Sequence, residues 1–442
     1  MAGTTLVPPG RQHKRTVSDQ QKRRELALQR QKQGRRDLQH HARQLALSAL
    51  NEVGDVSGEQ EEEPAVYELN VPRAASENVA ADYNEQDDTE ASMEDAERSP
   101  GSKRKTLLEG ANLKGLRARE FFARQLMLPE WMVDIPSYLK KDWFVMPRPE
   151  GQRCLVISAN GITLSRQRNG RILHSFPSAL PNGARTKEVA AGSHVYCILD
   201  CIFHEPDKTY YVIDMMCWRG YSLFDCTAEF RFFWMTTKLA ETGALGAPSA
   251  HHHYQFSVVP VYECNVAALQ AVYSGPVPFQ RDGILFYNRH ALYELGLTPL
   301  VVVWKDAQCS QYLLDTDSQG NVPTYQQVVL ELRSDGSVVT CDDPPVIFGT
   351  LAPEFLEQNA RHLKPGMLIR FAIGDQGLSL VEGKPVVADI HFEGIANKNR
   401  ARRADSCTKI LFQYAARHGA LTINDIVAAI ETSDEEGDTS MG

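Results

Sequence analysis

The chain has 442 residues, a formal net charge of −9, 43% hydrophobic residues and nine cysteines. This length gives room for two or three domains with a sizeable core. The chain has no apolar run long enough to cross a membrane and no signal-peptide core, so we expect a soluble intracellular protein without membrane contact. The odd number of cysteines, with no Cys-x-x-Cys pair, argues against a disulfide framework and a zinc site, and we expect no metal or other cofactor.

The first segment with a clear pattern is basic. Residues 11–46 contain eleven Lys and Arg against three Asp and Glu. Ser18 can cap a helix that starts near Asp19, but the leucines that follow give it only a sparse apolar face. Such a helix needs a partner in order to fold. The alternative is a disordered tail or a non-specific nucleic-acid-binding arm, because basic runs often have that role.

The order of the basic residues favours a specific partner. A short extended basic piece, residues 11–15, precedes a basic helix that closes at residues 41–43. This order resembles an importin-β-binding domain, which implies that the acidic inner surface of importin β wraps residues 1–51. The basic residues expected in this contact are Arg11, Lys14, Arg15, Lys22, Arg23, Arg24, Arg35, Arg36 and Arg43.

The next segment is acidic. Residues 52–98 contain sixteen Asp and Glu, two Arg and few large apolar residues. We expect residues 52–105 to form a disordered linker. Its last part, residues 99–105, is a short basic run that either serves as an import signal or simply ends the linker.

The folded part is expected to begin with an amphipathic helix over residues 112–128, which Pro129 ends. Trp131 follows directly. A tryptophan at this place is either a core anchor or the wall of a pocket.

Residues 143–157 form two apolar runs joined by a Pro/Gly turn, which predicts a hairpin with Arg148, Glu150 and Arg153 at its tip. The spacing Arg148-x-Glu150-Gly151-x-Arg153 is that of the KxDGxR signature of nucleotidyltransferases such as mRNA guanylyltransferases and ligases. Arg148 stands where their nucleophilic lysine is required, and a guanidinium stays charged and has no free lone pair. The pattern indicates a nucleotide pocket without the reaction; an ordinary surface hairpin is the alternative.

Strand-like segments follow at residues 195–203, 209–220, 283–287 and 300–305, with a helix predicted at residues 229–239. Together these elements predict an antiparallel α+β domain over residues 106–305. Arg168 lies near a turn of this domain and would contact phosphate if its side chain faces the pocket.

Short strands with turn residues between them continue from residue 312 to residue 389 and predict a small barrel or sheet domain over residues 306–431. Helices are expected at residues 406–417 and after Thr422, and residues 397–403 are strongly basic. Residues 432–442 are expected to be a disordered acidic tail.

Several segments together resemble snurportins: residues 125–131, 198–202, 210–220, 230–234 and 282–287. The resemblance spans residues 112–305. It implies a nuclear import adaptor that holds the 2,2,7-trimethylguanosine cap of spliceosomal snRNAs and links snRNPs to importin β. It also implies shuttling between nucleus and cytoplasm, recycling by an exportin, a nucleotidyltransferase-like fold and no enzyme activity. The C-terminal domain resembles the OB-fold of capping enzymes, so an active guanylyltransferase or RNA ligase remains the alternative.

The resemblance also implies roles for individual residues. Trp304 matches the tryptophan that stacks on the methylated base, and Trp131 matches the second aromatic wall. Methylation at N7 makes guanine cationic, so an indole face adds cation–π attraction to stacking. Arg168 matches a basic phosphate contact, and the further cap contacts expected are Arg148, Arg153 and Lys305.

Two departures from the family and its enzyme relatives matter. Pro129 replaces a serine of the family pocket, which leaves open whether a trimethylated or a monomethylated cap is preferred. Ile202, in the segment 199–202, stands where guanylyltransferases supply a glutamate, which weakens the enzyme alternative.

Overall fold

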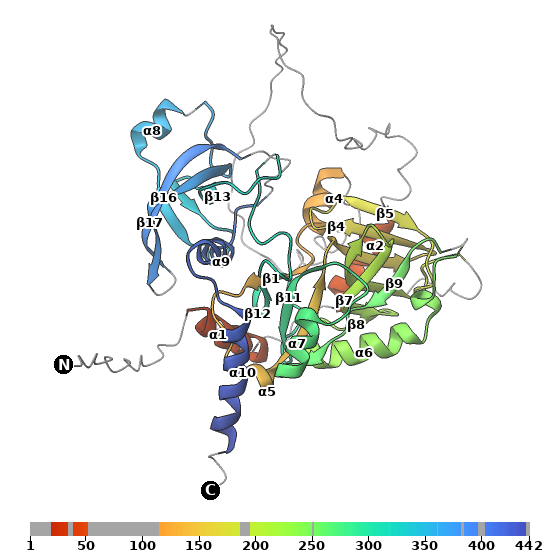
Figure 1. Cartoon of the computed structure of the whole chain (residues 1–442). Helices are drawn as coiled ribbons and strands as arrows, with labels where there is room; N and C mark the ends of the chain where they lie inside the picture. Colours follow the sequence, from red (N-terminus) through yellow and green to blue (C-terminus); the bar gives the residue numbers. More distant parts are fainter. Residues whose placement is uncertain are drawn as a thin grey trace, which may run out of the picture.

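A computed structural model of the chain describes residues 19–33, 39–51, 115–185, 195–249, 252–317, 319–359, 361–381, 384–396 and 403–438. The expected linker over residues 52–105 lies outside these residues, as do Arg11, Lys14, Arg15, Arg35 and Arg36. The described part is a mixed α+β structure with an N-terminal helical arm, a two-sheet body and a separate C-terminal sheet (Figure 1). Within the described ranges, no helix has the length and apolar character needed to span a membrane.

The basic arm forms two helices, α1 (Asp19–Gln33) and α2 (Gln39–Asn51). The predicted start near Asp19 is confirmed. Both helices pack against the body of the protein, although the arm was expected to need a separate partner (Figure 1). Ala42, Leu45 and Ala46 of α2 are buried in the main core, which explains how a helix with a sparse apolar face is stabilised here.

The first sheet of the body has five strands. Its order is β1 (Met127–Trp131), β12 (Gly296–Trp304), β11 (Arg281–Asn288), β2 (Trp143–Pro149) and β10 (Tyr262–Glu263). β1 runs parallel to β12, and the other neighbours are antiparallel.

The second sheet of the body is larger. Its order is β5 (Ile172–Phe176), β4 (Ile162–Gln167), β3 (Gln152–Ala159), β6 (Tyr196–His204), β7 (Thr209–Trp218) and β8 (Tyr221–Ser222), and β9 (Gln255–Val258) pairs with β7. The main core contains buried side chains from both sheets. The helices of the body are α4 (Gly115–Phe122), α5 (Leu139–Asp142), α6 (Ala228–Ala240), α7 (Val266–Ser274) and the 3-10 turn η3 (Gly243–Leu245).

Two predictions for the body are wrong, whereas the strands predicted at residues 195–203, 209–220, 283–287 and 300–305 and one predicted helix are confirmed. The segment 143–157 is not a hairpin, because β2 belongs to the first sheet and β3 to the second. Gly151 makes this crossing possible: its φ is +135°, and a Cβ there would lie 2.2 Å from the Phe203 carbonyl oxygen. The helix expected at 112–128 ends at Phe122, because residues from Met127 onward pair with β12. The helix expected at residues 229–239 is α6.

The C-terminal part is an antiparallel sheet with a core of its own. Its order is β15 (Ile347–Thr350), β14 (Ser337–Val339), β13 (Gln327–Leu332), β16 (Leu368–Val381) and β17 (Lys384–Ile395). The short helix α8 (Pro353–Gln358) lies beside it, followed by α9 (Cys407–His418) and α10 (Ile423–Asp438).

The C-terminal helices begin where the sequence predicts, because Ser406 caps α9. α10 continues to Asp438, so the expectation of a disordered tail from residue 432 is wrong up to that residue. Ile426 and Ile430 anchor the first turns of α10 in a buried cluster, and a helix that is already nucleated propagates easily.

Candidate functional site

Asp282 holds two cationic side chains together at one end of the first sheet. Its carboxylate accepts hydrogen bonds from Arg148, from the Lys305 amine and from the Ser310 hydroxyl, the last at 2.6 Å. Arg148 also donates to the Asp282 carbonyl oxygen at 3.2 Å. Two cations share the Asp282 carboxylate, and Glu150 is near enough to raise the pKa of Arg148.

The pKa values of both cations respond to this crowding. Burial is the main cause that lowers the pKa of Lys305, and the neighbouring Arg148 charge adds to it. Burial likewise lowers the pKa of Arg148, against the attraction of Asp282. A bound polyanion would relieve the repulsion, because each cation would gain a second opposite charge.

Trp131 lies next to this cationic group. The Lys305 amine is 5.5 Å from the centre of the Trp131 ring, in cation–π geometry. The Phe412 ring of α9 packs on the same tryptophan, with 5.0 Å between ring centres and 48° between planes. α9 is held there because the Thr408 hydroxyl accepts from the Trp131 backbone N–H at 3.3 Å.

Trp304 does not join the other predicted site residues. It pairs with Ile284 in the sheet, and Val303 pairs with Leu285, so alternate residues of β12 face opposite sides. Val303 and Leu285 belong to the main core, whereas Trp304 is 0% exposed in a second cluster on the other face. Its indole N–H donates to the Leu421 carbonyl at 3.0 Å.

Arg153 is engaged in a buried structural network. It donates to both carboxylate oxygens of Asp200, at 3.0 and 2.7 Å, and to the Met127 carbonyl at 2.6 Å. Tyr293 also donates to Asp200 at 2.6 Å. Burial alone would lower the pKa of Arg153, but the Asp200 charge and its hydrogen bonds raise it above the ordinary value. Arg153 therefore fixes the start of β1 from the second sheet.

Arg168 lies in the turn between β4 and β5, and its side chain is exposed. Protein nevertheless surrounds it enough that its pKa is lowered to about 10, first by burial and then by the charge of Arg403 and of Arg153. Arg168 and Arg403 thus extend the positive potential of the Arg148 group toward the C-terminal part. Among the residues that the structure describes, no group of three His, Cys, Asp or Glu could hold a metal ion.

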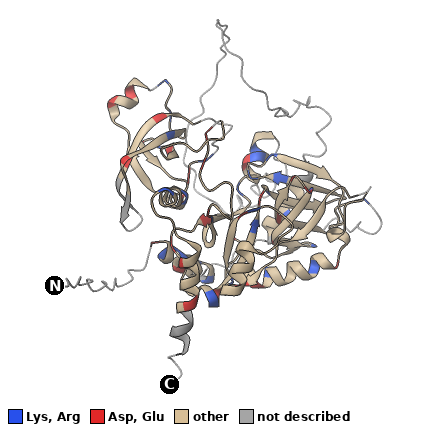
Figure 2. Ribbon diagram, in the orientation of Figure 1, with Lys and Arg blue, Asp and Glu red and all other residues tan. Residues whose placement is uncertain are grey.

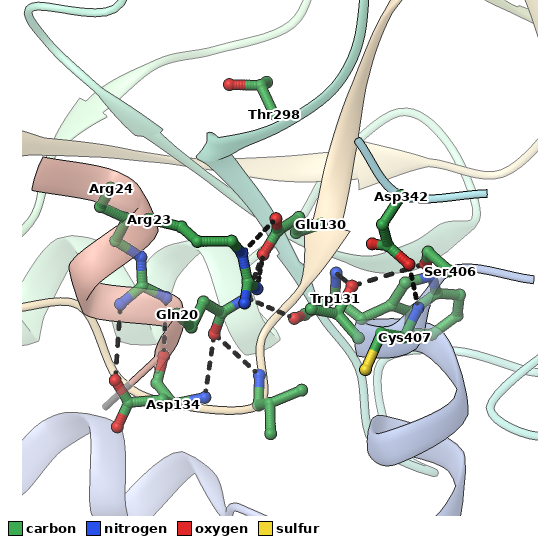
Figure 3. Close-up of polar contacts among 12 residues, drawn as sticks. Gln20, Arg23, Arg24, Glu130, Trp131, Asp134, Thr298, Asp342, Ser406 and Cys407 are labelled. Carbon is green, nitrogen blue, oxygen red and sulfur yellow. Dashed lines mark hydrogen bonds and ion pairs between the residues drawn. The ribbon is translucent and has the colours of Figure 1, made fainter. Parts of the chain in front are cut away.

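The arm helix α1 is attached to the strand that carries Trp131 (Figure 3). Glu130 accepts from Gln20 at 2.8 Å and from Arg23 at 3.2 and 2.8 Å. Gln20 also donates to the Trp131 carbonyl at 2.9 Å. Arg24, 2% exposed, donates to the Asp134 carbonyl at 2.9 Å. Two of the predicted importin contacts, Arg23 and Arg24, are therefore occupied by this internal interface.

The remaining predicted importin contacts that are described lie on the same arm. Lys22 is exposed and forms an ion pair of 3.8 Å with Asp19 within α1. Arg43 is an exposed residue of α2, on the helix whose apolar side enters the main core.

Sequence reasoning missed three features of this site. Asp282 was noted only as part of a family-like segment. Its role as the shared partner of Arg148 and Lys305 was not predicted. Phe412 could not be found from its own helix, because its contact with Trp131 joins residues far apart in the chain. The attachment of α1 was missed for the same reason.

A comparison with known protein families identifies the domain to which these residues are similar. Two sheets share one core, and Arg148 at the end of one of them stands at the position of the lysine in the KxDGxR signature. Residues 125–306 match the family model described as "Snurportin1, m3G cap-binding domain". The suspected resemblance to snurportins is thus confirmed over residues 125–306, which are similar to the cap-binding domain of that family.

Solved structures of ligases are also similar to this chain. A mycobacterial DNA ligase D complexed with ATP and MES is 13% identical, with a TM-score of 0.29, over 62% of this chain and 96% of that chain. The ligase domain of LigD from M. tuberculosis gives the same identity and coverage with a TM-score of 0.30. A Lig E DNA ligase is 13% identical over 61% of this chain and 98% of that chain, with a TM-score of 0.26.

Proposed function

We propose that this chain binds the trimethylguanosine cap of spliceosomal snRNAs and acts as an adaptor for their import into the nucleus. The observation that carries the proposal is the family match over residues 125–306, a range that contains β1, β2, β11 and β12. The geometry supports it, because an indole ring lies beside the clustered cations Arg148 and Lys305. A cationic base and an attached triphosphate bridge need both features.

The geometry suggests which residues of the proposed cap site contact the base and which contact the phosphates. Trp131 is the proposed stacking wall for the base, and Arg148, Lys305 and Arg168 are the proposed phosphate contacts. Arg153 supports the site through Met127 at the start of β1. Trp304, expected from the family resemblance to stack on the base, anchors the first sheet to the Leu421 segment in this conformation.

We infer further that the arm, α1 and α2 with the residues before them, binds importin β, and that an exportin recycles the protein between nucleus and cytoplasm. The distribution of basic residues over residues 11–46 supports the importin contact. Because Arg23 and Arg24 contact Glu130 and Asp134, α1 has to leave the body before importin β can surround it. We also propose that the C-terminal sheet is OB-like, on the basis of its five-stranded antiparallel order.

A guanylyltransferase or ligase reaction is not supported by the site. Arg148 cannot act as the nucleophile, because its guanidinium has no free lone pair. The Lys305 amine is directed at Asp282, with a second hydrogen bond to the Tyr312 carbonyl at 3.3 Å. We infer a binding protein in which Lys305 contacts phosphate.

The test is a calorimetric titration of the full chain with trimethylated, monomethylated and unmethylated cap dinucleotides. We expect saturable binding of the trimethylated dinucleotide and weak binding of the unmethylated one, since loss of the N7 methyl removes the positive charge of the base. Absence of binding to all three would reject the cap site. A parallel incubation with GTP and Mg²⁺ should leave no covalent guanylate on the protein, and a guanylate adduct would restore the enzyme alternative.

A further inference from the structure

Six exposed arginines form a basic surface beside the proposed cap site. They come from α4, from the turn and strand start after β4, and from the segment before α9: Arg117, Arg119, Arg124, Arg168, Arg171 and Arg403. Figure 2 shows this concentration of positive residues on α4 and on the neighbouring edge of the second sheet. We use "basic surface" for these six residues.

Contacts in the structure bring the three segments together. The turn that carries Arg168 lies directly on α4, because a Cβ at Gly170 would be 1.9 Å from the Arg119 carbonyl oxygen. Arg166, at the end of β4, places its guanidinium 3.9 Å from the centre of the Phe122 ring of α4. The β4–β5 turn and α4 thus form one rigid base for the exposed arginines.

A hollow connects this base to the C-terminal part. Its volume is about 330 Å³, and it is lined by Arg124, Gln125, Leu126, Leu295 and Arg403 among others. Arg403 therefore faces Arg124 across an opening with a partly apolar wall. Arg403 is also near enough to Arg168 to lower that residue's pKa by repulsion.

Protein carboxylates do not neutralise this surface. No ion pair within 4.0 Å joins any of the six arginines to another residue in the described ranges, and Glu120 is the one acidic residue on α4. Elsewhere in the body, Arg148, Arg153 and Arg231 all have carboxylate partners. Arginines without a carboxylate partner, grouped around a hollow, are the arrangement expected of a surface that binds an external polyanion.

We propose that the basic surface binds the single-stranded RNA chain that follows the cap, and that Arg124 and Arg403 hold its first nucleotides at the hollow. This inference rests on the proposed cap-binding function. Arg168 is near enough to both Arg403 and Arg148 for their charges to lower its pKa, so the surface continues from the proposed triphosphate contacts. Arginine suits phosphate by its planar fork, and the apolar wall of the hollow suits a base or ribose. The C-terminal part thereby takes part in RNA binding through Arg403.

The test compares two ligands on the full chain: the trimethylated cap dinucleotide and a trimethyl-capped RNA of about ten nucleotides. We expect the longer RNA to bind about tenfold more tightly at moderate salt. Its affinity should also fall more steeply with salt. In a plot of the logarithm of the binding constant against the logarithm of the salt concentration, each further phosphate contacted should add roughly 0.7 to the magnitude of the slope. In the double variant Arg124→Gln/Arg403→Gln, most of this gain should disappear, while the affinity for the dinucleotide stays within about twofold of the unmodified chain.

The matched control is Arg361→Gln, another exposed arginine, which should leave both affinities unchanged. An uncapped RNA of the same length should bind weakly and with the same sensitivity to the double variant. The inference is overturned if the capped ten-nucleotide RNA binds no more tightly than the dinucleotide, or if the double variant keeps the gain. Failure of the dinucleotide itself to bind would reject the cap site instead, so the two failures are distinguishable.

Discussion

Trp131 and Trp304 lie on neighbouring strands, where Trp131 packs against both clusters of the body and Trp304 belongs only to the second. Trp131 is half-buried beside Lys305, whereas Trp304 is fully buried and hydrogen-bonded to Leu421. In the proposed cap site the phosphates contact Arg148 and Lys305, so we expect the base to stack on Trp131, which lies beside Lys305. The two tryptophans should therefore respond differently to substitution.

We expect Trp131→Ala to lower the affinity for the trimethylated cap dinucleotide about 10- to 100-fold, because stacking contributes roughly 1–3 kcal/mol per base. Trp304→Phe should leave cap affinity unchanged and lower the free energy of unfolding by about 1–2 kcal/mol, since it removes a hydrogen bond and buried volume. Calorimetric titration and urea unfolding measure the two effects. A folded Trp304→Phe protein that no longer binds the cap would show that Trp304 reaches the ligand in another conformation.

Individual residues also show what the sequence could reveal. The motif around Arg148 predicts a nucleotide-type pocket from the sequence alone, because its spacing is local and its chemistry depends on the residue type. The side on which Trp304 lies could not be predicted, since it depends on the pairing of β12 with β11, and a shift by one residue reverses every side chain. The partners of Arg153 and Trp131 come from residues far away in the chain, and no local pattern contains them.

At the level of elements, α1 is attached by an apolar contact of Ala27 with Ala291 and Leu300, and by polar contacts that include those around Glu130. Arg23, with 39% of its side chain exposed, pairs with Glu130, which is 4% exposed. Gln20 bonds both the Glu130 carboxylate and the Trp131 carbonyl. Loss of one charge at Glu130 should thus loosen α1 without removing any basic residue that importin β would contact.

We expect Glu130→Gln to raise the affinity for importin β by roughly three- to tenfold, because a buried charge-assisted contact of about 1 kcal/mol then no longer holds α1. Fluorescence anisotropy with purified importin β measures the affinity. Amide hydrogen exchange of residues 19–33 reports the detachment directly. The control Glu357→Gln removes an exposed carboxylate on α8 and should change neither. Faster exchange without a gain in importin affinity would contradict the proposed role of the arm.

The helix α2 provides a pH-dependent attachment through His41. Its Nε2 lies 2.8 Å from the Gln125 side-chain oxygen, and its ring packs near Phe121 and Phe224. Burial lowers the pKa of His41, the hydrogen bond to Gln125 opposes this, and the neighbouring His40 lowers it further. A detached α2 therefore takes up a proton at a higher pH than an attached one, so attachment is complete above the ordinary histidine pKa and weakens as pH falls below it.

We expect residues 39–51 to be cut faster by a protease at pH 5.5 than at pH 7.5, relative to a His41→Gln variant measured under the same conditions. Glutamine keeps a hydrogen-bonding side chain but does not titrate, so the ratio between the two proteins removes the pH dependence of the protease. Equal responses of the two proteins would show that His41 does not control the attachment.

On the scale of the whole molecule, the C-terminal part contributes to the site as well as to stability. Besides the contact of Phe412 with Trp131, the Asp342 carboxylate accepts from the Cys407 backbone N–H at 2.7 Å at the start of α9 (Figure 3). A cap base that stacks on the Trp131 face covered by Phe412 has to displace that ring. The affinity for the cap is then limited by the fraction of molecules in which this face is open.

We expect Phe412→Leu to raise the affinity for the trimethylated cap dinucleotide by about three- to tenfold, because a leucine keeps most of the buried volume but removes the ring from Trp131. The control is Phe355→Leu on α8, which packs against Phe392 and not against Trp131. Calorimetric titration gives the affinities. An unchanged or reduced cap affinity in a folded Phe412→Leu protein would show that the cap approaches Trp131 from another side.

The attachment of α1 to β1 has a quantitative consequence for transport. In the proposed function, importin β and the body of this protein compete for one helix, so the concentration of importin β required for half-saturation should increase with the stability of the internal contact. Each 1.4 kcal/mol of that stability raises the requirement about tenfold. Glu130 and Trp131 are adjacent in β1, so a ligand that shifts this strand changes both equilibria. Equilibrium linkage then requires that importin β alters cargo affinity by the same factor as cargo alters importin affinity.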